Sequence, residues 1–218
     1  MKKLVTLATV LAMSVSVVSA QFTYGVKAGP NFANLTNADT FADFMAAGLA
    51  EEGFDATFDA KMRTSFHIGA FGEYKVSDLF SVAAELLYSG QGAKAEFKGE
   101  GFSGEIKQKF GYLNVPVLAK LYLTDDLSLD VGPQFGFLMS SKSAYEVTAG
   151  GQTTKGDEDS KEGLNKTDIS AALGLTYNFG NIFVQGRYNL GLNEFVKDNE
   201  GDDKFKNNVI QLSVGYRF

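Results

Sequence analysis

The chain has 218 residues, with 24 glycines, 3 prolines, no cysteine, no tryptophan and a formal net charge of −6 at pH 7. Apolar residues make up 44% and charged residues 21%, which excludes a disordered tail. Without cysteine, and with His67 as the only histidine, a disulfide scaffold, a cysteine metal site and a multi-histidine metal centre are excluded. The acidic charge argues against a nucleic-acid surface.

The first 20 residues have the pattern of a secretory signal peptide. Two lysines precede an uncharged stretch at residues 4–18, and small residues surround Ala20. The alternative is a first transmembrane helix, but the stretch is shorter than the roughly 20 residues that such a helix needs. We therefore expect a signal peptide at 1–20, cleavage near Ala20, and one mature domain at 21–218.

From residue 22 onward, apolar and polar residues alternate with period two, as is typical of β-strands with two unlike faces. Within 168–179, for example, Leu173 and Leu175 stand on either side of Gly174. The alternation predicts eight strands, at residues 22–29, 65–76, 80–89, 113–123, 129–139, 168–179, 182–192 and 210–218.

The connections alternate in length. Tight turns are expected at 77–79, 124–126 and 180–181, and long polar loops at 35–63, 95–109, 143–166 and 194–206. This asymmetry predicts an all-β fold, a transmembrane antiparallel up-and-down barrel with short periplasmic turns and long extracellular loops. The apolar residues of 39–47 have helical spacing, which is compatible with a short surface helix and also with an unstructured loop.

Alternation alone does not distinguish this barrel from a soluble lipocalin-like barrel, whose apolar face points inward. About forty side chains lie on the apolar face, too many for the interior of an eight-stranded barrel, so this face must look at lipid. The polar face is rich in glycine and serine, which suits a crowded lumen. Aromatic side chains close to the termini and short turns predict a periplasmic aromatic band, formed by Tyr24, Tyr74, Phe80, Tyr177, Phe179, Tyr216 and Phe218.

Charged residues also fall on the polar face. They are Lys27, Glu73, Lys75, Glu85, Lys120, Asp130, Asp168, Arg187 and Arg217. In a narrow lumen these charges must find partners, because an isolated buried ion is very costly. We expect them to pair and to plug the lumen, together with the inward-facing Phe71, Leu87, Leu118, Tyr122, Leu138 and Phe183. The alternative is a selectivity ring in an open pore.

Several motifs resemble those of PorT-like outer-membrane β-barrel proteins, the small OmpX/OmpA-type, porin-like barrels. They are GVKAGPNF at 25–32, YLNVPVLAK at 112–120, GPQFG at 132–136, RYNLGL at 187–192 and VGYRF at 214–218. The resemblance covers 21–218 and implies an eight-stranded barrel in the outer membrane of a Gram-negative-type bacterium. The last residue, Phe218, resembles the C-terminal signal that the barrel assembly machinery reads.

Two features of the sequence are candidate sites of chemistry. Ser65 and His67 point to the same face of one strand, and some small outer-membrane barrels that modify lipid A use His and Ser, but no third group completes a catalytic arrangement. The acidic runs 157–159 and 198–203 could hold Ca²⁺ or Mg²⁺ against lipopolysaccharide phosphates, yet neither contains a complete calcium-loop motif. We therefore expect a structural histidine, solvated loops, no enzymatic activity, and no catalytic, cofactor-binding or metal-ligating residue.

The sequence thus predicts a structural or surface-interaction module that acts through acidic extracellular loops. The expected partners are outer-membrane lipid, lipopolysaccharide and the barrel assembly machinery, the expected state is a monomer, and the extracellular partner is not identified. The alternatives are a small passive pore for ions or solutes and a soluble periplasmic lipocalin-like binding barrel.

Overall fold

The computed structural model describes residues 21–36, 46, 56–159, 164–194 and 205–218. Eight of its strands close a ring in which β1 is hydrogen-bonded to β9, and β6 pairs with β5 outside the ring. The strands are β1 (Phe22–Leu35), β2 (Ala56–Lys75), β3 (Phe80–Gly99), β4 (Phe102–Tyr122), β5 (Leu127–Ala149), β6 (Gln152–Asp159), β7 (Thr167–Phe179), β8 (Ile182–Gly191) and β9 (Asn207–Arg217).

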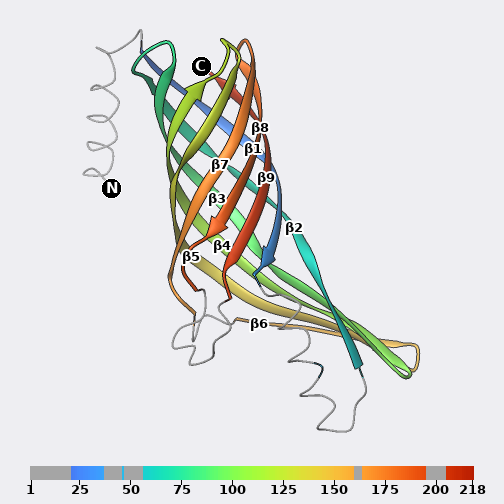
Figure 1. Ribbon diagram of the computed structural model, residues 1–218. Helices are drawn as coiled ribbons and strands as arrows, with labels where there is room; N and C mark the ends of the chain where they lie inside the picture. The colour runs from blue at the N-terminus through green and yellow to red at the C-terminus, as the bar shows by residue number, and fades with distance from the viewer. Residues whose placement is uncertain (1–20, 37–45, 47–55, 160–163, 195–204) are drawn as a thin grey trace, which may run out of the picture.

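The ring is an antiparallel barrel of inclined strands (Figure 1). The connections that follow β2, β4 and β7 are short and lie at the same end as the C-terminus (Figure 1). The eight-stranded up-and-down barrel predicted from the alternation is therefore confirmed. The described residues contain no helix that is long and apolar enough to span a bilayer.

The two faces of the barrel wall are oriented as expected. Leu86 and Leu173, on the apolar face, are each 54% exposed, whereas Leu118, on the polar face, is 1% exposed. An outward-facing apolar surface fits a hydrocarbon environment and excludes the soluble lipocalin-like alternative, in which these residues would be inside.

The aromatic band lies at the periplasmic end, near the chain terminus. The rings of Tyr24 and Phe218 stack with centroids 5.5 Å apart, and those of Tyr177 and Phe179 are 4.6 Å apart. Backbone hydrogen bonds tie the last residue into the wall, since the amide of Phe218 donates to the carbonyl of Tyr24 at 2.9 Å.

Three of the four predicted long loops are wrong at least in part: 95–109 and 143–166 are largely β-hairpins, and 56–63 of the predicted loop 35–63 belongs to β2. β3 continues to Gly99 and β4 begins at Phe102, and β5 and β6 are joined at Gly150 and Gly151. Both of these last glycines have positive φ, 56° and 79°, as a two-residue turn that follows the twist of the strands requires. Period two persists through both segments. Their polar composition, however, is typical of loops and accounts for the wrong prediction.

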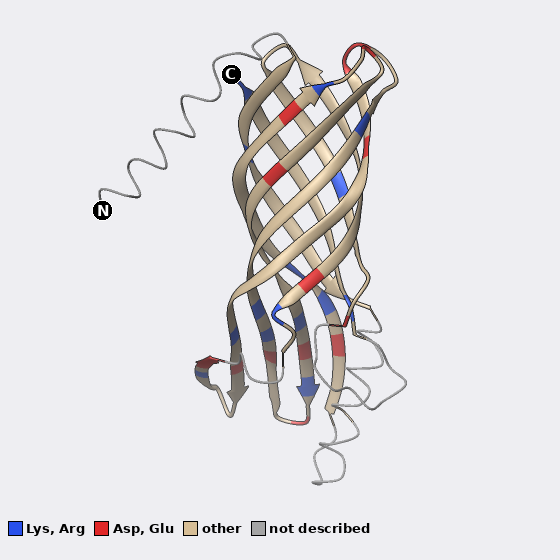
Figure 2. Ribbon diagram, turned by 90° about the vertical axis from the view of Figure 1, so that its left-hand side faces the viewer, with Lys and Arg blue, Asp and Glu red and all other residues tan. Residues whose placement is uncertain are grey.

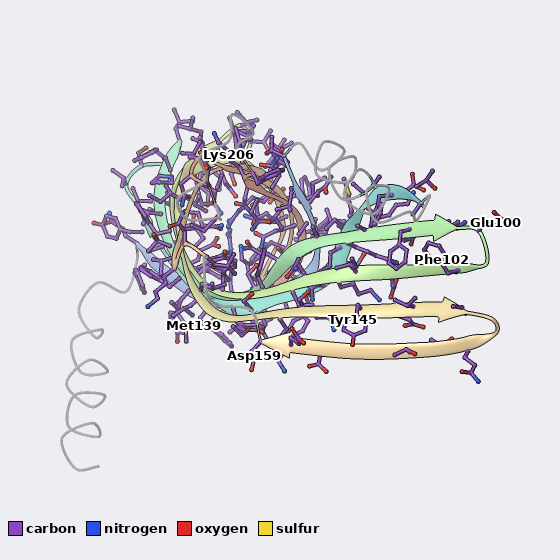
Figure 3. The ribbon with its side chains drawn as sticks, turned by 90° about the horizontal axis from the view of Figure 1, so that it is seen from below. Glu100, Phe102, Met139, Tyr145, Asp159 and Lys206 are labelled. Atoms are coloured by element: carbon purple, nitrogen blue, oxygen red, sulfur yellow. The ribbon has the colours of Figure 1, made fainter. Side chains whose placement is uncertain are left out.

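The outer parts of β2 to β5, together with β6, form one antiparallel sheet that extends beyond the ring, at residues 56–62, 93–99, 102–109, 142–149 and 152–159. We call it the projecting sheet. Figures 1 and 3 show it leaving the extracellular end to one side, with Glu100 and Phe102 at the far end of one hairpin. The acidic run 198–203 lies outside the described residues, as does 39–47 except for Ala46.

Candidate functional site

The middle of the lumen holds a buried cluster of three charged side chains. Glu85 on β3 accepts two hydrogen bonds from the guanidinium of Arg187 on β8, at 2.6 and 2.8 Å. The ammonium of Lys27 on β1 lies 2.7 Å from the same carboxylate. Because a two-pronged arginine contact fixes both groups, this cluster ties opposite walls of the barrel together.

Hydrogen bonds extend this cluster toward the periplasm. Lys27 donates to Gln185 at 2.9 Å, and the amide nitrogen of Gln185 donates to Asp130 at 2.8 Å. Lys120 lies 3.8 Å from Asp130 and 3.2 Å from Glu73, which brings the chain of alternating charges to the mouth of the barrel. The neutral member Gln185 was missed in the sequence, although its position on the polar face is visible in the alternation.

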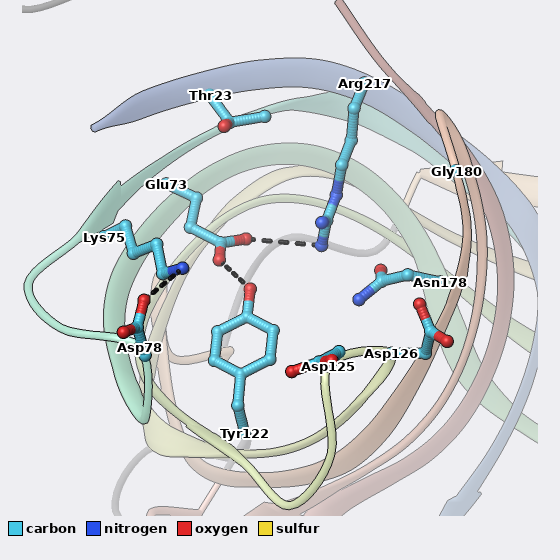
Figure 4. Close-up of a pocket in the computed structure, with 10 residues that line it drawn as sticks. All are labelled: Thr23, Glu73, Lys75, Asp78, Tyr122, Asp125, Asp126, Asn178, Gly180 and Arg217. Carbon is cyan, nitrogen blue, oxygen red and sulfur yellow. Dashed lines mark hydrogen bonds and ion pairs between the residues drawn. The ribbon is translucent and has the colours of Figure 1, made fainter. Parts of the chain in front are cut away.

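The periplasmic mouth is a cavity of about 410 Å³ (Figure 4). Inside it Glu73 accepts a hydrogen bond from the hydroxyl of Tyr122 and faces the guanidinium of Arg217 at 3.4 Å. Lys75 lies at the rim instead of in the closed lumen, with its side chain 51% exposed and its ammonium 2.9 Å from Asp78. This contact lowers the pKa of the Asp78 carboxyl below its ordinary value.

The predicted set of lumen charges is therefore right for eight residues and wrong for Lys75. The remaining charges are balanced, four of each sign, and seven of them belong to the chain of ion pairs and hydrogen bonds described above. Asp168 is the exception: its carboxyl is buried on β7 and forms no ion pair among the described residues.

Most polar side chains in the extracellular half of the lumen are neutral. The two ring nitrogens of His67 lie 2.7 Å from Asn31 Oδ1 and 2.8 Å from Ser213 Oγ. Ser65 instead donates to the carbonyl oxygen of Gly90 at 2.5 Å, so the candidate nucleophile and base are not joined to each other. His67 is buried among groups that satisfy both of its nitrogens, as the sequence predicted.

Asn114 on β4 and Asp168 on β7 both lie close to Gly136 on β5, which is between their strands. A Cβ atom at Gly136 would lie 2.8 Å from the amide oxygen of Asn114 and 3.2 Å from the Cβ of Asp168. Neither amide atom of Asn114 has a hydrogen-bond partner in the described part of the chain. Glycine is therefore needed at 136 because two polar side chains from adjacent strands occupy the space in front of it.

Bulky apolar side chains also point into the lumen. Phe71 and Phe183 meet edge to face with ring centroids 5.4 Å apart, and Leu87 and Leu118 are almost fully buried. Tyr122 and Leu138 are partly buried. Ion pairs, amides and these apolar side chains therefore all contribute to the inner surface of the barrel.

The projecting sheet has two unlike faces. On one face the aromatic ring of Phe97 lies between those of Phe58 and Phe102, with centroid distances of 5.4 and 6.3 Å. The other face carries ion pairs, such as Lys94 with Glu105 at 2.7 Å. The sheet is therefore an amphipathic surface outside the ring.

Comparisons with known proteins agree with this architecture. The family model described as outer membrane protein beta-barrel domain matches residues 16–197. Among solved structures, the chain is similar to Ail, the attachment invasion locus protein of Yersinia pestis, at 14% identity and a TM-score of 0.43, covering 91% of this chain and 99% of that one.

Two further solved structures are similar at comparable levels. Neisserial surface protein A is 11% identical with a TM-score of 0.42, covering 89% of this chain and 97% of that one. The outer membrane protein OprG of Pseudomonas aeruginosa is 14% identical with a TM-score of 0.33, covering 91% of this chain and 96% of that one. A search among curated proteins found no match. Because the family model covers most of the chain, and the fold is the barrel that it describes, this protein belongs to the outer membrane protein beta-barrel domain family.

Proposed function

We propose that the protein is a closed barrel of the outer membrane whose task is to present the projecting sheet at the cell surface, where it acts as an interaction module. The observation that supports this proposal is the buried contact of Glu85 with Lys27 and Arg187 across the lumen. Breaking one partner out of a buried ion pair typically costs about 3–5 kcal/mol, so an open water column is strongly disfavoured.

The sequence-based expectations about processing and partners belong to the same proposal. Residues 1–20 are removed near Ala20, the assembly machinery recognises the last strand through Phe218, and the mature barrel is a monomer in contact with outer-membrane lipid and lipopolysaccharide. The chain is a PorT-like member of the small barrels. Its role is not enzymatic.

Recordings in planar bilayers test the closed lumen against the pore alternative. We expect no steady conductance from the purified barrel, because side chains of β1, β3 and β8 meet across its middle. Large, stable single-protein steps whose ion selectivity changes in Lys120→Gln would contradict the proposal and make Lys120 part of a selectivity site. A useful control is Lys98→Gln, which removes a lysine of the projecting sheet, outside the lumen.

A further inference from the structure

Two rows of lysines cross the projecting sheet on one face. Lys94 on β3 lies directly opposite both Lys61 on β2 and Lys107 on β4. One step closer to the barrel, Lys109 on β4 is opposite Lys142 on β5. Residues that are two apart on a strand share a face, so Lys107 and Lys109 place both rows on the same side.

This face continues the lipid-facing surface of the barrel. On β4 the odd-numbered residues point outward, so Leu113 of the apolar wall is followed by Gly111 and then by Lys109 and Lys107. Lys109 is about 13 Å along the strand from Leu113, at 3.3 Å per residue. The lysines therefore begin just past the apolar wall, at the level where lipid headgroups lie. Figure 2 shows several charged residues on this end of the strands, in addition to those along the barrel.

The positive charge is least compensated in the row closest to the barrel. Lys94 is neutralised from the distal side by Glu96 and Glu105, at 2.9 and 2.7 Å. Lys142 has only the longer contact of 3.6 Å with Asp157 on β6, and Lys109 has no ion pair among the described residues. Like charges directly opposite each other destabilise a sheet, so an anion between Lys109 and Lys142 would relieve a repulsion.

The space for such an anion is present. A depression of about 450 Å³ lies on this face. Four lysines line it, Lys107, Lys109, Lys142 and Lys155, together with the carboxylates of Glu105, Glu146 and Asp157. Its floor includes Ala144, which stands opposite Lys107 where a longer side chain would fill it. The carboxylates at its border are already engaged, as Glu146 is with Lys155 at 2.9 Å.

We propose that Lys109 and Lys142, with Lys107 beside them, bind the phosphate group of an outer-leaflet lipid. An acidic row lies on the far side of the lysines, where Glu105 is opposite both Glu96 and Glu146. It repels soluble anions that approach from the extracellular side, as does the net charge of −6. A lipid phosphate reaches the lysines from the membrane side and avoids this barrier. The site depends on the place of the barrel in the membrane, not on the closed lumen.

The test uses the full mature barrel in phosphatidylcholine nanodiscs that contain a small fraction of lipid A. Native mass spectrometry measures the lipid A retained per barrel. We expect the double variant Lys109→Gln/Lys142→Gln to lose retention about tenfold. The matched control Lys75→Gln/Lys98→Gln removes the same charge, at the periplasmic rim and beyond the acidic row, and should retain lipid A as the unaltered barrel does.

Three results would overturn the proposal: unchanged retention in Lys109→Gln/Lys142→Gln, equal retention of dephosphorylated lipid A, or complete displacement of lipid A by inorganic phosphate, which would assign the site to a free anion. Heat-modifiable migration on gels verifies that each variant is folded. Lys109→Arg/Lys142→Arg keeps both charges and should restore retention, and a loss there as large as in the glutamine variant would also contradict a phosphate site.

Discussion

At the scale of single residues, Glu85 is central to the lumen cluster, because among the described residues it is the only carboxylate that forms ion pairs with both Lys27 and Arg187. In Glu85→Gln the two cations would face each other without a counter-charge. We expect a loss of about 3–5 kcal/mol in the free energy of unfolding. Urea titration followed by heat-modifiable migration measures it, with Glu100→Gln at the hairpin turn as the control. An unchanged urea midpoint would show that Glu85 is not a tie between the walls.

The orientation of the barrel wall is tested at Leu173, which is exposed on the lipid-facing side of β7. A cation in Leu173→Arg would lie within the hydrocarbon layer, where it costs about 2–4 kcal/mol near the midplane. We expect reduced amounts of folded protein in outer-membrane fractions. Leu79→Arg makes the same change in an exposed periplasmic turn and should assemble normally. Equal levels of the two variants would refute the assigned orientation.

Alternation in the sequence predicts which side of the barrel wall a side chain occupies, but not which residues meet across the lumen. Period two separates inward from outward positions, so Arg187 and Leu118 were placed correctly. It does not contain the register, which is set when the ring closes and decides that Lys27 meets Glu85. Nor does it mark how far along a strand the lumen ends, so Lys75 was placed inside although it lies at the rim.

At the scale of elements, the error over 95–109 and 143–166 has a physical cause. Beyond the barrel the outward face becomes charged and the face that continues the lumen becomes apolar, as at Phe97. Strand ends predicted from outward-facing apolar residues therefore fall at the membrane boundary, although the strands continue beyond it. The signal that could have located the β5–β6 hairpin is Gly150-Gly151, since paired glycines favour a two-residue turn.

The projecting sheet can be shortened without touching the ring. Lys94 and Lys107 are opposite each other, so replacing residues 95–106 by Asn-Gly should close a tight hairpin at that point. We expect the shortened barrel to migrate as a heat-modifiable folded band, because every pair of strands in the ring keeps its register. Loss of the folded band would mean that the sheet is needed for assembly and is not a separate surface module.

The ion pairs of the projecting sheet also predict a dependence on pH. Hydrogen bonds and charge from Lys107 and Lys94 lower the pKa of Glu105. A carboxyl with a lowered folded-state pKa stabilises the fold above its unfolded-state pKa, and this contribution is lost as pH falls through the folded-state value. After correction for intrinsic rates, amide exchange in 94–107 should be similar at pH 7 and pH 5 and faster at pH 3. Uniform protection down to pH 3 would contradict this.

At the scale of the whole molecule, we expect the β5–β6 turn to lie outside the cell and the β4–β5 turn to lie in the periplasm, because they are at opposite ends of the barrel. An epitope inserted between Gly150 and Gly151 should be detected by antibody on intact cells. The same epitope between Asp125 and Asp126 should become detectable only after the outer membrane is permeabilised. Surface detection of the second insertion would reverse the orientation of the barrel.

β4 is a single strand of 21 residues, so the membrane wall and the projecting sheet share one hydrogen-bonded ladder. Its outer eight residues extend about 26 Å at 3.3 Å per residue. A surface held on such a ladder has few backbone conformations to lose when it meets a partner, whereas a loop of the same composition would be ordered at an entropic cost. A partner therefore meets this surface in an orientation set by the tilt of the whole barrel in the membrane and by its rotation about the membrane normal.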